Sequence, residues 1–465
     1  MPGSVKERLV VIGGNAAGMS AASQARRRRG PTELEIVAFE RSPYTSYSTC
    51  GVPYLVGGLV ADGESLIART PEAFREQYHI DARVGQEVHG IDLDRRAVQV
   101  SSRADGQTAW EPFDQLVIAV GAEPIRPQLP GSDASGICGL KSLEDGLYLD
   151  ALVEREQPRR AVVVGGGYIG LEMAEALIMR GLSVALIERN PQVMTTLDAE
   201  LGALVSDALR QVGVDLYLSE LVTGYETSNG RVTGVVTEAR TLPADLVVLG
   251  IGTRPDARLA RAAGISVGPS GGIRVNQQMQ TEVPGVWACG DCAETFHLVS
   301  RQPVAFALGT IANKQGRIAG INLGGGYASF PGVVGTAVSK LCDLEVARTG
   351  LNERESRRAG FQFLTATIES TSRAGYYPHP GHLTVKVVTE RETGKLLGAQ
   401  IVGREGAAKR IDVFATALFA GFTVFDLVNL DLSYAPPFAP VWDPVLVAAR
   451  KAADLVDADR GSPRR

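Results

Sequence analysis

Several features that would narrow the class of this protein are scarce in its 465 residues. Five cysteines are too few for a disulfide-built scaffold of this size, so we expect a reducing compartment, the cytoplasm. The longest apolar-looking stretch, residues 413–425, is shorter than the roughly 20 residues that span a membrane. A net charge of −5 lacks the strongly basic face that nucleic acid requires. We therefore predict a soluble globular protein with no membrane and no nucleic-acid partner.

Metal ligands are scarce as well. Cys289 and Cys292 have the C-x-x-C spacing of redox and zinc motifs, but neither a second such pair nor a histidine pair accompanies them. The five histidines are scattered along the chain. We predict no metal site.

Glycine, in contrast, is abundant, with 53 residues, or about 11% against a usual value of roughly 7%. Such an excess is typical of tight turns and of backbone that lies close to a ligand. Two glycine-rich segments, residues 8–40 and 160–188, are alike. Each reads as strand, glycine turn, helix, strand and acidic residue, which indicates one βαβ unit used twice.

The first turn runs from Gly13 to Gly18 and is followed by Glu40, and the second runs from Gly165 to Gly170 and is followed by Glu188. The first glycine of such a motif permits a tight turn, and the last lets the helix pack closely on the strand. A pyrophosphate then rests on free N–H groups at the helix N-terminus, and the acid accepts hydrogen bonds from ribose hydroxyls. The sequence therefore predicts two dinucleotide-binding units.

The rest of the chain suggests how these units are completed. Strand-like runs end at Gly121 and Gly250, and Asp291 follows a short strand and precedes a helix candidate over 306–319. Beyond residue 335 the pattern changes: runs at 361–368, 383–388 and 396–402 predict an antiparallel sheet, with helices at 408–420 and 424–430. We expect an α/β protein with two Rossmann-like domains, a C-terminal α+β domain and a polar, flexible tail over 457–465.

These motifs, in this order, resemble the FAD-dependent pyridine nucleotide–disulfide oxidoreductases over nearly the whole chain. The resemblance implies that residues 1–125 and 256–335 form an FAD-binding domain and that residues 126–255 bind NAD(P)H. Residues 336–456 would form a dimerisation domain. It also implies cofactor-binding roles for Gly13, Gly14, Asn15, Ala16, Ala17, Gly18, Glu40, Arg41, Thr49, Ala119, Gly121, Gly165, Gly167, Tyr168, Ile169, Gly170, Glu188, Gly252, Asp291 and Thr310.

A single cysteine identifies the branch. Cys50 lies in the stretch YTSYSTCGVPY, and the positions five residues before and after it are Thr45 and Leu55. Members similar to glutathione reductase carry two cysteines there. A lone cysteine is similar to the branch that contains coenzyme A-disulfide reductases, NADH oxidases and peroxidases, and polysulfide reductases.

Two C-terminal segments, 374–378 and 431–444, look like the coenzyme A-disulfide reductase subgroup. They carry Tyr376 and Tyr434, which by resemblance reach the active site from the partner subunit and donate a proton or a hydrogen bond to a leaving thiolate. Aromatic packing at the dimer interface is the alternative role for both. Tyr377 is a neighbouring candidate. Ala16 stands where the peroxidase and oxidase subgroup has histidine, and Thr49 stands where asparagine often precedes the cysteine.

The predicted chemistry centres on Cys50. Pro53 suits the first turn of a helix, so Cys50 would lie near a helix N-terminus, where the dipole favours a thiolate. A mixed disulfide with coenzyme A is the resting form that the resemblance implies. The same subgroup places coenzyme A contacts at Gln24, Arg27, Ser46 and Thr49, although basic residues at 26–29 also simply complement a helix C-terminus.

The sequence thus predicts a homodimeric FAD enzyme with shared active sites that reduces coenzyme A disulfide. Glu188 favours NADH because it repels a 2′-phosphate, whereas Arg189 leaves NADPH possible. Two enzymatic alternatives remain: polysulfide reduction through a persulfide on Cys50, and NADH oxidation through a sulfenic acid. A redox-sensing flavoprotein is the alternative outside enzymes.

Overall fold

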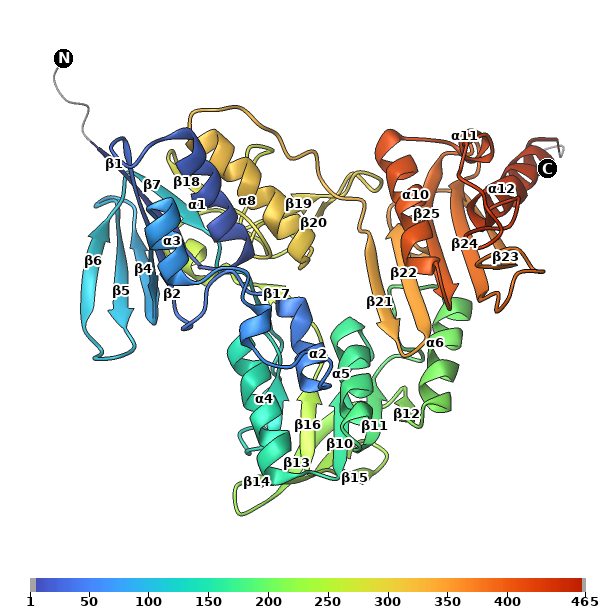
Figure 1. The fold of residues 1–465 in the computed structure, drawn as a ribbon, viewed down its shortest axis with the longest axis horizontal. Helices are drawn as coiled ribbons and strands as arrows, with labels where there is room; N and C mark the ends of the chain where they lie inside the picture. Colours follow the sequence, from blue (N-terminus) through green and yellow to red (C-terminus); the bar gives the residue numbers. More distant parts are fainter. Residues whose placement is uncertain (1–5, 462–465) are drawn as a thin grey trace.

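The computed structural model describes residues 6–461, which form three regions, each built on its own five-stranded sheet (Figure 1). In the first, a parallel sheet has the strand order β18-β7-β1-β2-β3. Its strands are β1 Glu7–Ile12, β2 Leu34–Glu40, β3 Asp81–Val84, β7 Gln115–Ile118 and β18 Val286–Ala288. Their continuous apolar runs fit a sheet that is buried on both faces.

Helices α1 (Ala16–Arg28) and α8 (Gly309–Leu323) pack against each other on this sheet. Their close approach requires glycine, since a Cβ on Gly316 would lie 2.2 Å from the carbonyl oxygen of Ala17. Helix α8 begins and ends later than the predicted 306–319. The region also holds an antiparallel sheet and short elements: α3 Pro71–Tyr78, β4 Gln86–Asp92, β5 Ala97–Ser102, β6 Thr108–Pro112, α7 Arg258–Ala262, β19 Thr295–Phe296 and β20 Pro303–Val304.

The second region repeats this plan with a parallel sheet in the order β12-β11-β10-β16-β9. Its elements are β9 Ile137–Gly139, α4 Leu143–Glu156, β10 Arg160–Val164, α5 Tyr168–Met179, β11 Ser183–Glu188, α6 Ala199–Gln211, β12 Asp215–Leu218, β13 Val222–Ser228, β14 Arg231–Thr237, β15 Thr241–Pro243 and β16 Leu246–Leu249. The chain enters and leaves this region along one antiparallel pair, β8 (Ala122–Pro124) and β17 (Thr253–Pro255).

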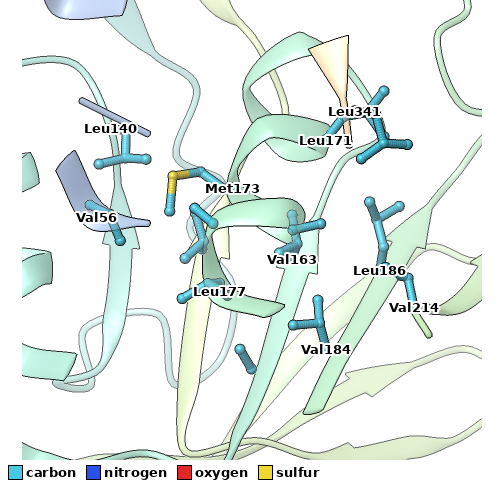
Figure 2. Packing of buried hydrophobic residues seen from close by; sticks show 14 of the residues in the cluster. Val56, Leu140, Val163, Leu171, Met173, Leu177, Val184, Leu186, Val214 and Leu341 are labelled. Carbon is cyan, nitrogen blue, oxygen red and sulfur yellow. The ribbon is translucent and has the colours of Figure 1, made fainter. Parts of the chain in front are cut away.

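The core of the second region includes residues from both other regions. Figure 2 shows Val163, Leu177 and Leu186 of this region's own elements packed with Val56 and Leu341. Val56 comes from the segment that carries Cys50, and Leu341 comes from the C-terminal sheet. The Cys50 segment is therefore anchored on the second region, although in the sequence it belongs to the first.

The third region is an antiparallel sheet in the order β21-β22-β25-β24-β23, as the sequence predicted. Its elements are β21 Ala337–Leu341, β22 Leu344–Gly350, α9 Glu353–Arg358, β23 Phe363–Thr371, β24 His382–Glu390, β25 Leu396–Gly403, α10 Ala407–Ala420, α11 Val424–Val428 and α12 Pro444–Gly461. Over residues 6–461, none of the helices combines the length and the apolar character that a bilayer crossing demands.

The prediction of a flexible tail from residue 457 is wrong for residues 457–461, which form the end of α12. Val456 is fully buried on this helix, and Arg460 donates hydrogen bonds to the backbone oxygen of Glu392. Arg460 also lies over the ring of Phe425. These tertiary contacts hold a segment that its polar composition alone would leave frayed. Residues 462–465 of the predicted tail lie outside the described residues.

Candidate active site

A cleft of about 2260 Å³ runs between the three regions. Both glycine turns and Cys50 open into it, which brings together motifs that are more than 100 residues apart in sequence. Of the predicted site residues, those that line it are Gly13, Asn15, Ala16, Ala17, Glu40, Arg41, Ser46, Thr49, Cys50, Ala119, Gly121, Gly165, Gly167, Tyr168, Ile169, Glu188, Gly252 and Asp291.

The first glycine turn is shaped by steric exclusion. Gly13 has a φ of +107°, and a Cβ there would lie 2.3 Å from the carbonyl oxygen of Ala119. A Cβ on Gly18 would lie 2.0 Å from the carbonyl oxygen of Gly13, so this glycine packs α1 against the turn instead of lining the cleft. The Gly14 N–H donates to the Glu40 carboxylate at 2.7 Å, which fixes that acid beneath the turn.

The second turn repeats this geometry residue by residue. Gly165 has a φ of +104°, and its Cβ would meet the carbonyl oxygen of Gly250 at 2.5 Å. A Cβ on Gly170 would lie 1.9 Å from the carbonyl oxygen of Gly165. The Gly166 N–H donates to Glu188 at 2.7 Å. The two turns are therefore equivalent cradles, with free lone pairs on each acid for ribose hydroxyls.

Asn15 explains why the first turn departs from the glycine pattern. Its side-chain oxygen accepts a hydrogen bond from the Tyr47 N–H at 3.1 Å, and its amide nitrogen lies 3.4 Å from the Thr49 hydroxyl. Asn15 thus ties the turn to the segment that presents Cys50. At the equivalent place in the second turn, a Cβ on Gly167 would meet only the oxygen of Gly250 at 3.9 Å.

Lys141 is a site residue that the sequence analysis missed. Its Nζ is buried at the cleft and has no hydrogen-bond partner among residues 6–461. Burial lowers the pKa of this ammonium group. A buried cation without a partner calls for an anionic ligand, so the two cradles and Lys141 together fit dinucleotides and their pyrophosphates. The only feature of the sequence that could have indicated Lys141 is its position directly before Ser142, the N-cap residue of α4.

Cys50 lies on a short 3-10 turn, Thr49–Gly51, that leads into α2 (Val52–Val56), with Pro53 in the first turn of that helix as predicted. The predicted lowering of its pKa is wrong. The pKa of the thiol is raised, first by partial burial and then by the carboxylates of Glu172 and Asp291. A helix of five residues carries too little dipole to offset these effects.

The carboxyl group of Glu172, on α5, lines the cleft near Cys50 and was also missed. It accepts a hydrogen bond from the Ser339 hydroxyl of β21 at 3.0 Å, and burial raises its pKa. Burial likewise raises the pKa of Asp291 to about 6. The site therefore contains carboxyl groups that hold protons more readily than usual next to the thiol, a feature typical of proton-transfer sites.

The two predicted tyrosines lie away from this cleft within one chain. Tyr376 and Tyr434 are 78% and 46% exposed and are absent from the cleft lining. Their phenols are hydrogen-bonded to each other, which raises the pKa of Tyr434. Phe438, Val441 and Trp442, which follow Tyr434 closely in the sequence, are exposed as well. A single chain therefore does not bring them to Cys50.

The predicted coenzyme A contacts fall into two groups. Ser46 and Thr49 line the cleft beside Cys50. Gln24 and Arg27 lie toward the far end of α1, about 14 and 18 Å along the helix from Asn15. Only a long ligand lying along α1 would touch both groups.

Other predicted positions are peripheral. Thr310 is exposed on the first turn of α8 and does not line the cleft. Cys289 and Cys292 are fully buried, and burial raises the pKa of Cys292 to about 12, so neither offers a reactive thiolate. Residues 6–461 contain no cluster of three or more His, Cys, Asp or Glu side chains arranged to hold a metal ion.

Comparison with known proteins finds two family models that match this chain. "Pyridine nucleotide-disulphide oxidoreductase" matches residues 7–316, and the dimerisation domain of the same family matches residues 336–444.

Relatives match over nearly the full length. The chain is 41% identical to "NAD(P)H sulfur oxidoreductase (CoA-dependent)" of Pyrococcus abyssi, over 96% of this chain and 98% of that one. It is 30% identical to "Coenzyme A disulfide reductase" of Staphylococcus epidermidis, over 96% of this chain and 99% of that one. The crystal structure of reduced Bacillus anthracis CoADR-RHD superposes with a TM-score of 0.94 and 36% identity, covering 98% of this chain and 81% of that one.

Proposed function

Because the chain belongs to the pyridine nucleotide-disulphide oxidoreductase family, we propose that it is an FAD-dependent enzyme that uses NAD(P)H and Cys50 to cleave a sulfur–sulfur bond. The preferred substrate is coenzyme A disulfide. The observation that carries the proposal is the convergence of two dinucleotide cradles and one accessible cysteine on the same cleft.

The residues divide between two cofactors. The Gly13–Gly18 turn, Glu40, Lys141 and Asp291 would hold FAD, and the Gly165–Gly170 turn with Glu188 would hold NAD(P)H. When bound, FAD accepts a hydride from the nicotinamide and passes the electron pair to sulfur. Both glycine turns and Cys50 line one cleft, so the two dinucleotides would lie within reach of the thiol.

The Cys50 thiolate attacks one sulfur of coenzyme A disulfide, forms a mixed disulfide and expels one coenzyme A thiolate. Two electrons and a proton derived from NAD(P)H then cleave the mixed disulfide, restore Cys50 and release the second thiol. Because burial, and then the carboxylates of Glu172 and Asp291, raise the pKa of Cys50, the thiol needs a proton acceptor. The half-buried Glu172 carboxyl lines the same cleft and would receive and return that proton.

A second substrate is favoured by the name of the Pyrococcus relative, a sulfur oxidoreductase that depends on CoA. In that case the Cys50 thiolate attacks the outer sulfur of a persulfide or polysulfide, becomes a Cys50 persulfide and expels the remaining thiolate or shortened polysulfide. Two electrons from NAD(P)H then cleave the Cys50 persulfide to hydrosulfide and restore the thiolate. The same residues serve both reactions, since each begins with thiolate attack on a sulfur–sulfur bond.

Intact mass of the protein purified without reductant, with peptide mapping, separates the substrates. We expect one coenzyme A moiety on Cys50, removed by NADH. Added sulfur atoms would identify persulfide reduction, and added oxygen would identify an oxidase. Cys50→Ser should abolish disulfide turnover, whereas Cys342→Ser should not, because Cys342 is half-buried outside the cleft lining. An unmodified Cys50 that is dispensable for NADH-dependent turnover would refute the proposal.

We also propose a homodimer in which Tyr434 and Tyr376 of one subunit complete the site of the other. The exposure of both tyrosines and of the nearby apolar residues Phe438, Val441 and Trp442 supports this proposal. Dilution that produces monomers should therefore abolish disulfide reduction, and full turnover by monomers would contradict the shared-site proposal.

All five cysteines are free, which fits the reducing cytoplasm.

NADH is the expected coenzyme. Glu188 is buried, and its carboxylate is held by the Gly166 and Asn190 N–H groups, so its charge stays at the ribose position. Arg189 beside it is exposed in the cleft and offers partial compensation for a 2′-phosphate. Arg189→Ala should reduce kcat/KM for NADPH several-fold and leave that for NADH nearly unchanged.

A further inference from the structure

The loop between β11 and α6, residues 189–198, is pressed against the second glycine turn. The Met194 N–H donates to the carbonyl oxygen of Gly166 at 2.7 Å. A Cβ on Gly166 would lie 2.7 Å from the Val193 side chain, so the loop leaves no room for a side chain on the turn at this position. Thr195, the residue after Met194, lines the cleft. The position of this loop therefore sets the position of the turn that we assign to NAD(P)H.

The loop is held from outside its own region. Arg348 on β22 donates to the carbonyl oxygen of Thr196 at 2.8 Å, and Asn352 donates to the same oxygen at 3.2 Å. Arg354 on α9 donates to the carbonyl oxygen of Thr195 at 2.9 Å. All three belong to the C-terminal region, and Figure 1 shows its sheet next to α6.

A buried charge cluster also holds the end of the loop in place. Lys386 of β24 is only 2% exposed, and its ammonium lies 3.0 Å from the Asp198 carboxylate and 2.7 Å from that of Glu353. Glu200 is a third partner. Gln400 of β25 accepts from the Asp198 N–H at 2.6 Å and donates to its carboxylate at 2.7 Å. A buried ammonium requires such partners, so this junction is held in one geometry.

The loop also has a conformation that it would not favour unaided. Met194 has a φ of +49°, in the left-handed region that a non-glycine residue rarely adopts. Bonds from the C-terminal region end on Thr195 and Thr196, directly after this strained residue. They hold the conformation in which the Met194 N–H reaches Gly166.

We infer that the C-terminal sheet positions the NAD(P)H-binding turn through the 189–198 loop, with Arg348, Arg354 and Lys386 as positioning residues. This inference rests on the proposed binding of NAD(P)H at the second turn. Coenzyme affinity then depends on a region that the family comparison matches to dimerisation and that contributes no residue to the turn itself.

Arg354→Ala tests the inference with little risk to folding, because Arg354 is exposed. Arg358→Ala is the matched control, since Arg358 is also an exposed arginine on α9. We expect KM for NADH to rise about threefold in Arg354→Ala, as for the loss of one hydrogen bond, with kcat within about twofold and FAD content unchanged. The control should match the wild type.

Lys386→Met should raise KM for NADH by about tenfold or more, and Lys386→Arg should recover most of it because the charge is kept. Dissociation constants for NAD⁺, measured by calorimetry on the FAD-loaded protein, should follow the same order without requiring a sulfur substrate. Tight NAD⁺ binding that is unchanged in Arg354→Ala and Lys386→Met would overturn the inference and leave the proposed function intact. A wild-type protein that binds neither NAD⁺ nor NADP⁺ would overturn both.

Discussion

The near identity of the two glycine turns allows each cofactor site to be disabled separately. Gly18→Ala and Gly170→Ala add one methyl group at equivalent positions. In the first turn the new Cβ would lie 2.0 Å from the Gly13 oxygen, and in the second it would lie 1.9 Å from the Gly165 oxygen. Neither obstacle is a flexible side chain, so helix or turn must move.

For the new Cβ and the carbonyl oxygen to reach ordinary contact at 3.4 Å, the helix and the glycine turn must move apart by about 1.5 Å in either variant. A shift of this size breaks an N–H···O hydrogen bond from turn to phosphate, because such bonds require ~2.7–3.2 Å. A hydrogen bond to a charged group contributes ~1.5–3 kcal/mol, so one lost contact lowers affinity by roughly 10- to 100-fold.

We therefore expect Gly170→Ala to retain FAD and to raise KM for NADH at least about tenfold. Gly18→Ala should lose FAD, measured by the flavin absorbance per chain after gel filtration. Gly30→Ala, beyond the other end of α1, is the control, since its Cβ would meet nothing closer than 3.8 Å. Wild-type binding of both cofactors in both variants would refute the cradle interpretation. Loss of FAD from Gly170→Ala alone would show that the two sites are assigned in the wrong order.

Three further predictions concern titratable groups. Glu172→Gln removes a charge that raises the pKa of Cys50, so the pH profile of Cys50 alkylation should move to lower pH; an unmoved profile would contradict the contact. Lys141→Met should raise the melting temperature of the FAD-free protein, because it removes a buried cation that no described residue hydrogen-bonds, and should weaken FAD binding about tenfold. Unchanged FAD affinity would exclude Lys141 from the site. Burial lowers the pKa of His297 to about 4 in the folded protein. As the pH falls from 6.5 toward 4, the unfolded chain therefore binds a proton on this histidine that the folded chain does not bind. The free energy of unfolding should then fall by about 3 kcal/mol toward pH 4, relative to His297→Gln, in urea titrations.

The local geometry of the cradles follows from short-range rules and could be predicted. The close helix packing at Gly18 and Gly170 depends on residues within one βαβ unit, and the glycine spacing of the motif also predicts the tight turns at Gly13 and Gly165. The first helical turn at Pro53 is local in the same way. These features are therefore readable from a single sequence.

Lys141 and Glu172 could not be found in this way, because burial defines them. Lys141 matters through an ammonium group that is buried at the cleft and has no hydrogen-bond partner in the described part of the chain. Glu172 matters through its effect on Cys50 and its hydrogen bond from Ser339. Both depend on contacts between distant segments. The pKa of Cys50 was predicted with the wrong sign for the same reason, since the dipole is a local effect and the opposing carboxylates are not.

By itself, the amino-acid sequence determined the two dinucleotide units, the lone cysteine between them and the antiparallel C-terminal sheet, since periodicity, glycine spacing and turn chemistry are local properties. Only the tertiary structure decided that the Cys50 segment packs on the second region, that α12 extends through residue 461 and that Arg354 and Lys386 hold the 189–198 loop. Each of these three features depends on burial or charge pairing between segments far apart in the chain. Such contacts between distant segments are not encoded in any one stretch of sequence.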